Sequence, residues 1–282
     1  MNSLNDTFIL HNGLKIPCVG FGTYLSKAGG ETENAVLCAL QNGYRHIDTA
    51  AFYANEQDVG TAVKKSGIPR NDIFITTKCW NTDRGYNNVK AACNKSLKAL
   101  GLSHIDLYLI HWPANRKQFG ERAAEINADT WRAFENLYTE GKVRAIGVSN
   151  FLPHHLKELN KTALIPPMVN QIELRPGFWQ SETTAYCREN NIIAEAWSPL
   201  GRGASLSDAS IQALAQKYGR TAAQIILRRI LQLGVVPLPK SVTPSRIAEN
   251  ARLFDFTLSE EDCAIIDAIQ SPAGKNPDEI DF

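Results

Sequence analysis

The sequence predicts an α/β protein whose fold is a (β/α)8 barrel. Short apolar segments alternate with longer segments of helical periodicity, and eight such pairs fit within the 282 residues. Several apolar segments are continuous, as is typical of parallel strands buried on both faces. The first of them ends in Gly20-Phe21-Gly22 and lacks the third glycine of a dinucleotide-binding turn, which disfavours a doubly wound sheet.

Eight strands are expected in chain order, at residues 19–23, 46–48, 73–78, 105–111, 145–149, 168–171, 193–197 and 235–237. Helices are expected between and after them, at 31–42, 56–66, 87–100, 129–140, 153–160, 181–190, 208–231 and 244–251. Thr221 and Gln224 form a capping-box pattern, and Thr243-Pro244 predicts an N-cap followed by proline in the first helical position.

A hairpin is expected before the barrel begins. Residues 8–10 and 15–17 flank Asn12-Gly13, the preferred sequence of a type I′ turn. We expect this hairpin to cover the amino-terminal mouth of the barrel. No linker-like segment divides the chain, so residues 1–282 are predicted to form a single domain with a short carboxyl-terminal tail.

Composition narrows the class of protein. The net charge is +1, from 30 basic and 29 acidic residues, so no global field favours nucleic acid or membrane partners. The six cysteines are scattered without metal-ligand spacing, so neither a structural metal nor a disulfide framework is expected. No signal peptide or 18-residue apolar run is apparent, which indicates a cytoplasmic protein.

Four polar residues stand at or just after the carboxyl ends of predicted strands, where barrel enzymes place their chemistry. They are Asp48, Tyr53, Lys78 and His111. Each alone is more often a cap, a solvated side chain or a packing residue. The barrel, however, directs all four to one mouth.

Together these four residues form a coherent acid system. Free tyrosine has a pKa near 10, and a nearby cation lowers the pKa by stabilising the phenolate. Lys78 can supply that cation, with Asp48 holding it in place, so Tyr53 can act as a general acid toward a carbonyl oxygen. Neutral His111 can donate a second hydrogen bond to the same oxygen. The arrangement suits carbonyl reduction by hydride, which a cofactor must supply.

A cofactor site is indicated by the segment after the last strand. Lys240, Ser241 and Arg246 could bind a phosphate there, although a helix cap with two exposed cations is an alternative. Ser149, Asn150 and Gln171 end two other strands and could hold a carboxamide. Trp197 ends a third strand, and its ring is available for stacking. For each of these four residues, packing or capping is an equally simple interpretation.

Three segments of the chain resemble the aldo-keto reductase family. They are residues 43–60, containing His46-Ile47-Asp48 and Tyr53; residues 142–151, containing Ser149-Asn150; and residues 238–244, containing Pro239-Lys240-Ser241. They occur in family order, and Lys78 and His111-Trp112-Pro113 lie between the first two. The resemblance extends from about residue 12 to the carboxyl terminus and is closest to the prokaryotic 2,5-diketo-D-gluconate reductase and methylglyoxal reductase branch.

The resemblance implies an NADPH-dependent reductase of small aldehydes, α-dicarbonyls or keto-sugars, without a Rossmann fold. It implies Asp48, Tyr53, Lys78 and His111 as catalytic residues and a 2′-phosphate site at Lys240, Ser241 and Arg246. The other implied cofactor contacts are Thr23, Ser149, Asn150, Gln171, Trp197, Ser198, Leu200, Val242, Thr243, Glu249 and Asn250. The implied substrate contacts are Trp80, His111 and Trp112, with Tyr24 and Phe52 as weaker candidates, and the short tail implies an open pocket.

Two other functions are compatible with parts of this pattern. A regulatory subunit that binds NADPH, resembling the potassium-channel β-subunits, would share the barrel and the phosphate site, but the complete catalytic set argues for turnover. A metal-dependent hydrolase or isomerase would need a cluster of carboxylates or histidines at the strand ends, and only Asp48 and His111 qualify. We expect a monomer that acts on a small-molecule carbonyl substrate.

Overall fold

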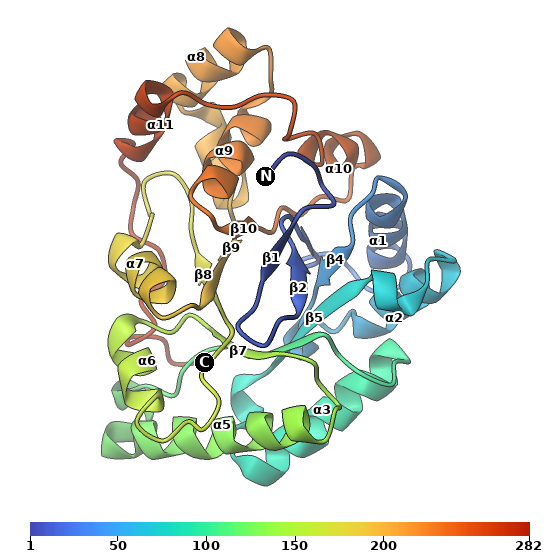
Figure 1. Cartoon of the computed structure of the whole chain (residues 1–282), viewed down its shortest axis with the longest axis vertical. Coiled ribbons are helices and arrows are strands. Elements are labelled where there is room, and N and C mark those ends of the chain that lie inside the picture. The colour runs from blue at the N-terminus through green and yellow to red at the C-terminus, as the bar shows by residue number, and fades with distance from the viewer.

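Eight parallel strands form the centre of the protein in the computed structural model, which describes residues 1–282. Neighbouring strands in the sheet follow one another in the chain, and the sheet curls so that the helices surround it (Figure 1). The strands are β3 (Phe21–Gly22), β4 (His46–Asp48), β5 (Phe74–Cys79), β6 (Leu107–Ile110), β7 (Ile146–Ser149), β8 (Val169–Glu173), β9 (Ile193–Trp197) and β10 (Val236–Pro237). The predicted α/β barrel is confirmed.

The barrel closes where its first and last strands meet, at a junction that we call the seam. Gly20 N donates to Pro237 O at 3.1 Å, and Gly22 N donates to Pro239 O at 3.0 Å. A Cβ atom at Gly20 would lie 2.7 Å from Nδ1 of the buried His46 ring and would also meet the Leu238 side chain, so a larger residue here would force these buried side chains to move.

The helices largely follow the predicted ranges. They are α1 (Glu31–Gln41), α2 (Glu56–Lys65), α3 (Tyr86–Leu100), α4 (Arg116–Phe119), α5 (Ala123–Thr139), α6 (Pro153–Leu159), α7 (Ser181–Glu189), α8 (Ala209–Tyr218), α9 (Ala222–Gln232), α10 (Pro244–Asn250) and α11 (Glu260–Asp267). No helix combines the length and apolar character needed to cross a membrane.

The single helix expected at 208–231 is wrong, because two helices occupy that range. Gly219 adopts φ 61° and ends α8, as a left-handed residue commonly does. Thr221 then begins α9 with the predicted capping box, in which its side chain accepts from the Gln224 backbone N–H. The helices α4 and α11 were not expected, and α5 starts six residues before the predicted position 129.

The amino-terminal hairpin consists of β1 (Thr7–Ile9) and β2 (Lys15–Pro17) and lies across the centre of the view, in front of the barrel strands (Figure 1). Asn12 donates to Arg144 O, just before β7, so the hairpin covers the end where the strands begin. The expected type I′ turn is wrong. That turn needs two successive residues with positive φ, and here only Gly13 has one, at 84°.

The carboxyl-terminal segment, residues 271–282, returns across the opposite mouth of the barrel. The buried side chain of Asn115 donates to Pro277 O at 2.8 Å and to Ile280 O at 2.9 Å. Arg175 donates to Ser271 Oγ and to Pro272 O. These bonds attach the segment to the loops that follow β6 and β8.

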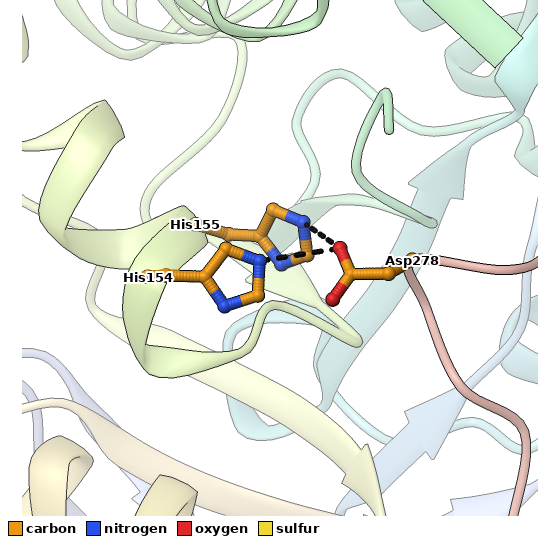
Figure 2. A group of neighbouring side chains, drawn as sticks. All are labelled: His154, His155 and Asp278. Carbon is orange, nitrogen blue, oxygen red and sulfur yellow. Dashed lines mark hydrogen bonds and ion pairs between the residues drawn. The ribbon is translucent and has the colours of Figure 1, made fainter. Parts of the chain in front are cut away.

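Two histidines of α6 hold the same segment through Asp278 (Figure 2). The Nε2 atoms of His154 and His155 lie 3.2 Å and 3.0 Å from Asp278 Oδ1. His155 Nδ1 accepts from the Leu152 backbone N–H at 3.2 Å, so the ring carries its proton on Nε2 and donates to the carboxylate. The cluster therefore acts as a hydrogen-bonded anchor for the tail.

Candidate functional site

A cleft of about 890 Å³ opens at the carboxyl ends of the barrel strands. Most of the predicted site residues line it: Tyr24, Asp48, Phe52, Tyr53, Trp80, His111, Trp112, Ser149, Asn150, Gln171, Trp197, Ser198, Leu200, Lys240, Ser241, Arg246, Glu249 and Asn250. Lys78 lies beneath the floor with its side chain 1% exposed. Thr23, Val242 and Thr243 are not part of the lining.

Lys78 and Asp48 form a buried ion pair at the floor of the cleft. Lys78 Nζ lies 2.7 Å and 2.8 Å from the two carboxylate oxygens of Asp48, and donates to Thr49 O at 2.9 Å. The ammonium also lies 3.4 Å from the Tyr53 hydroxyl. Adjacent strands β4 and β5 supply the pair, and a short 3-10 helix, Ala51–Tyr53, places the tyrosine above it.

Tyr53 is protonated throughout the neutral range. Burial raises the pKa of its phenol to about 12, although the neighbouring Lys78 ammonium acts to lower it and the Asp48 carboxylate to raise it further. The sequence-based expectation of a lowered pKa is therefore wrong for this structure, because removing the phenolate from water outweighs the attraction of one cation that is already paired. The hydroxyl keeps a proton that it can donate.

His111 is uncharged. Burial, followed by the positive charge of Lys78, holds its pKa well below the usual value of 6.5. Its Nδ1 is buried without a hydrogen-bond partner. The ring centroid lies 5.7 Å from that of Tyr53 and 4.9 Å from that of Trp80. The two polar side chains thus face the same part of the cleft, next to an aromatic wall.

Three polar residues at the ends of β7 and β8 are held by hydrogen bonds: Ser149, the last residue of β7, Asn150, which follows it, and Gln171 within β8, whose backbone O accepts from Ser149 Oγ at 2.7 Å. Asn150 adopts φ 63°, and its side-chain N–H groups donate to His111 O and Ser149 Oγ. Its Oδ1 accepts from Trp197 Nε1 at 2.8 Å, which fixes the indole ring in the cleft wall. Gln171 donates both amide hydrogens to carboxylates, to Asp48 Oδ2 and Glu195 Oε2, each at 2.8 Å. Its oxygen is therefore left to accept from a ligand.

The cationic end of the cleft lies after β10. Lys240 and Arg246 line it and form no salt bridge, and Ser241 lines it as well, with its hydroxyl accepting from the Thr243 backbone N–H at 3.1 Å. Glu249 accepts from the Thr221 hydroxyl at 2.6 Å. Two unpaired cations on one wall suit a dianionic phosphate.

Three of the predicted cofactor residues are not placed to line this cleft. Thr23 is fully buried, and its hydroxyl donates to Asp48 O at 3.0 Å, which ties β3 to β4. Val242 is 40% exposed, and Thr243 precedes α10 without using its side chain as a cap. Thr23 therefore serves the scaffold beneath the cleft.

The residues that line the cleft fit NADPH. The lining combines unpaired cations at one end with the Gln171 amide oxygen, a free acceptor, and the indole ring of Trp197 at the other. The long cleft between them includes Ser198, which adopts φ 49°. A strained backbone of this kind is common where a ligand must be contacted closely.

The end of the cleft beside Tyr53 has aromatic walls. Phe52 stacks on Trp80 with ring centroids 3.9 Å apart, and Trp112 faces Trp197 edge-on at 6.4 Å. The tail completes this end, because the Phe282 ring stacks parallel to Trp80 at 5.8 Å and Lys275 also lines the cleft. The short tail thus forms part of the wall, where the sequence suggested an open pocket.

Several residues in and beneath this cleft were not predicted from the sequence, among them Lys275, Phe282, Arg202 and Glu195. Lys275 and Phe282 lie in a segment without periodicity, so no local pattern could place them. Arg202 lies over the Tyr24 ring at 5.7 Å. Glu195 lies within β9, where a glutamate between alanines in a buried strand was a usable signal.

Comparisons with known proteins agree with this geometry. The model of the Aldo/keto reductase family matches residues 19–271. A glyoxal reductase of Bacillus subtilis (strain 168) is 50% identical over 282 residues, with 99% of each chain covered. The structure of MGS-M4, an aldo-keto reductase from a Medee basin deep-sea metagenome library, aligns with TM-score 0.92 at 44% identity, covering 98% of this chain and 100% of that one. A variant of Gox0644 in complex with NADPH gives TM-score 0.91 at 37% identity, with 99% of both chains covered.

Proposed function

This chain belongs to the aldo/keto reductase family, and on that premise we propose that it reduces small aldehydes and α-dicarbonyls to alcohols with Tyr53 as the general acid. The cofactor is NADPH, as in solved relatives that hold NADPH or NADP. The observation that carries the proposal is the single cleft in which Tyr53, His111 and the buried Lys78–Asp48 pair lie together.

Bound NADPH supplies the hydride. We assign its 2′-phosphate to Lys240, Ser241 and Arg246, whose donors have no internal ion-pair partner. Further contacts to its nicotinamide end are assigned to Ser149, Asn150, Gln171 and Trp197, and those to the rest of the molecule to Ser198, Leu200, Glu249 and Asn250.

The proton comes from this chain. Tyr53 holds a proton at neutral pH and donates it to the carbonyl oxygen as negative charge develops there. Lys78, 3.4 Å from the hydroxyl, stabilises the resulting phenolate, and Asp48 keeps the ammonium charged and in place. Neutral His111 donates a hydrogen bond that orients the carbonyl.

The substrate assignment rests on the cleft and on a relative. Trp80, Trp112 and Phe282 enclose an apolar space beside Tyr53, which suits a small carbonyl compound. The similar Bacillus subtilis protein is named a glyoxal reductase, so we place glyoxal and its substituted analogues first among the substrates. Keto-sugars come after them.

The test is NADPH oxidation at 340 nm with glyoxal, methylglyoxal, phenylglyoxal, 4-nitrobenzaldehyde, a diketo-sugar acid and an aldose. We expect turnover with the dicarbonyls at rates well above those with the aldose. Tight NADPH binding without turnover of any compound would contradict the proposal and favour the regulatory-subunit alternative.

We also propose that the chain functions as a single-domain monomer in the cytoplasm. One barrel supplies every assigned residue, and all six cysteines are free thiols, as suits a reducing compartment. Sedimentation velocity with and without NADPH measures the oligomeric state directly, and a dimer at micromolar concentration would contradict the proposal.

Arg246→Ala is expected to weaken NADPH binding about 10- to 100-fold while changing NADH binding less than about threefold, because charge-assisted hydrogen bonds to the 2′-phosphate are lost. Fluorescence titration gives both dissociation constants. Arg252→Ala, which removes an exposed arginine outside the cleft, is the matched control. Equal weakening of both cofactors would show that Arg246 does not bind the 2′-phosphate.

A further inference from the structure

A second carboxyl group lies beneath the cleft, on β9. Glu195 is 0% exposed, and its Oε2 accepts from Gln171 Nε2 at 2.8 Å. The other hydrogen of the same amide goes to Asp48 Oδ2, also at 2.8 Å. One amide group therefore connects Glu195 to the carboxylate that holds Lys78.

No residue paired with Glu195 in the sheet carries a positive charge. Its neighbours in the sheet are Gln171 on β8 and Val236 on β10, and both are neutral. The nearest ring nitrogen is His46 Nε2 on β4, at 3.8 Å from Glu195 Oε1. Burial, followed by the charge of Lys78, lowers the pKa of His46 to about 3, so this ring is also neutral.

The remaining charged groups facing Glu195 are Asp48 on β4 and Lys78 on β5. The ammonium is already committed to the Asp48 carboxylate, to a backbone carbonyl and to the Tyr53 hydroxyl. A negative charge on Glu195 would thus be a second buried carboxylate beside a single paired cation, which is costly. Oε1 is buried without a partner, and it is the oxygen that can carry a proton, because Oε2 accepts from Gln171.

We propose that Glu195 is a positioning residue for the reduction: as an uncharged carboxylic acid it holds Gln171 against Asp48, and loss of its proton slows proton donation by Tyr53. This inference rests on the proposed role of Tyr53. An ionised Glu195 places a negative charge next to Asp48 and so opposes formation of the phenolate.

The pKa of Glu195 is well separated from the pKa values of its neighbours. Burial, with the charge of Asp48 adding to it, raises the pKa of Glu195 to about 8. The phenol of Tyr53 has its pKa at about 12, and that of His111 lies well below 6.5. A loss of activity centred near pH 8 is therefore a signature of Glu195 within this group.

The experiment compares kcat for glyoxal reduction from pH 6 to 10 in wild type and Glu195→Gln, which keeps the size of the side chain. We expect wild-type kcat to fall about three- to tenfold around pH 8, and the variant to show no such fall. Glu56→Gln is the matched control. It alters another buried carboxyl, which accepts from Thr77 and does not contact Gln171, and it should retain the fall.

Thermal melting of the protein without cofactor gives a readout independent of activity. Folded Glu195 has a pKa near 8, and the unfolded side chain has the ordinary value of 4.5, so the folded state binds the proton more tightly. The resulting stabilisation is fully present below pH 4.5 and is lost as the pH rises to 8. Between pH 5 and 8 the Tm of wild type should therefore decline relative to that of Glu195→Gln.

Different results separate the two proposals. Parallel Tm profiles would overturn the uncharged state of Glu195. Diverging Tm profiles with identical kcat profiles would overturn its connection to proton donation. Failure of the proposed function itself would be seen in a separate experiment, as turnover by a Tyr53→Phe variant. Neither the kcat comparison nor the Tm comparison uses that variant.

Discussion

Tyr53→Phe should abolish carbonyl reduction while leaving NADPH binding unchanged. The substitution removes only the hydroxyl that lies 3.4 Å from Lys78 and keeps the ring, which packs 5.0 Å from that of Tyr24. A positioned general acid contributes about 10²- to 10⁴-fold to a rate, and we expect kcat with glyoxal to fall by at least that factor. The dissociation constant for NADPH, from fluorescence titration, should stay within about twofold, because the assigned cofactor contacts remain.

Tyr108→Phe is the control for this substitution. It also removes a buried tyrosine hydroxyl, but one inside the core without a hydrogen-bond partner, stacked on Phe134 at 4.7 Å. Its kcat should match that of wild type. If Tyr53→Phe retained more than about one tenth of wild-type kcat, Tyr53 would not be the general acid.

Lys78→Met has the second large expected effect, on both stability and activity. The substitution leaves the Asp48 carboxylate buried with no cation, and breaking a buried ion pair in this way costs about 3–5 kcal/mol. Urea unfolding of the protein without cofactor should show a free energy of unfolding lower by that amount. Reduction should be lost as well, since no charge then stabilises the Tyr53 phenolate.

Asp48→Asn combined with Lys78→Met separates the two effects. The double variant has neither charge, so it should regain part of the lost stability without regaining activity. A single variant Lys78→Met that unfolded at the wild-type urea concentration would contradict the importance of the pair.

The sequence predicted the barrel because each strand and helix carries its own local signal. The order of strands in the sheet then follows from chain order alone. Local sequence patterns failed where one short segment is compatible with two backbone structures. Asn12-Gly13 suits several hairpin turns, and here Asn12 keeps a negative φ and donates to Arg144 O. The break at Gly219 was missed because apolar periodicity continues through α8 and α9.

The clustering of the proposed catalytic residues was predictable, because parallel strands end at one mouth and so bring Asp48, Lys78 and His111 together there. The pKa values within this group were not predictable. The raised pKa of Tyr53 depends on how completely the fold excludes water, and no spacing of residues encodes that.

The contributions of the tail were also beyond the sequence. Phe282 stacks on Trp80 at the end of a segment that Asn115, after β6, and His155, on α6, hold in place. His155 lies near the start of α6, where solvated polar residues are common, but it is buried and bonded to Asp278. Such contacts join segments that are distant in the chain, and the sequence pattern of one segment carries no information about the other.

The contacts at the seam affect the order in which parts of this protein fold. Gly20 and Gly22 bond to Pro237 and Pro239, so the contacts that close the barrel join residues from opposite ends of the chain. Contacts of such long sequence separation require the largest loop closure and form late. Gly22 and Lys240 line the cleft on the two sides of this junction. A nascent chain still attached to the ribosome therefore lacks the cofactor cleft until its eighth barrel strand has been synthesised, and cofactor capture reports on completed folding.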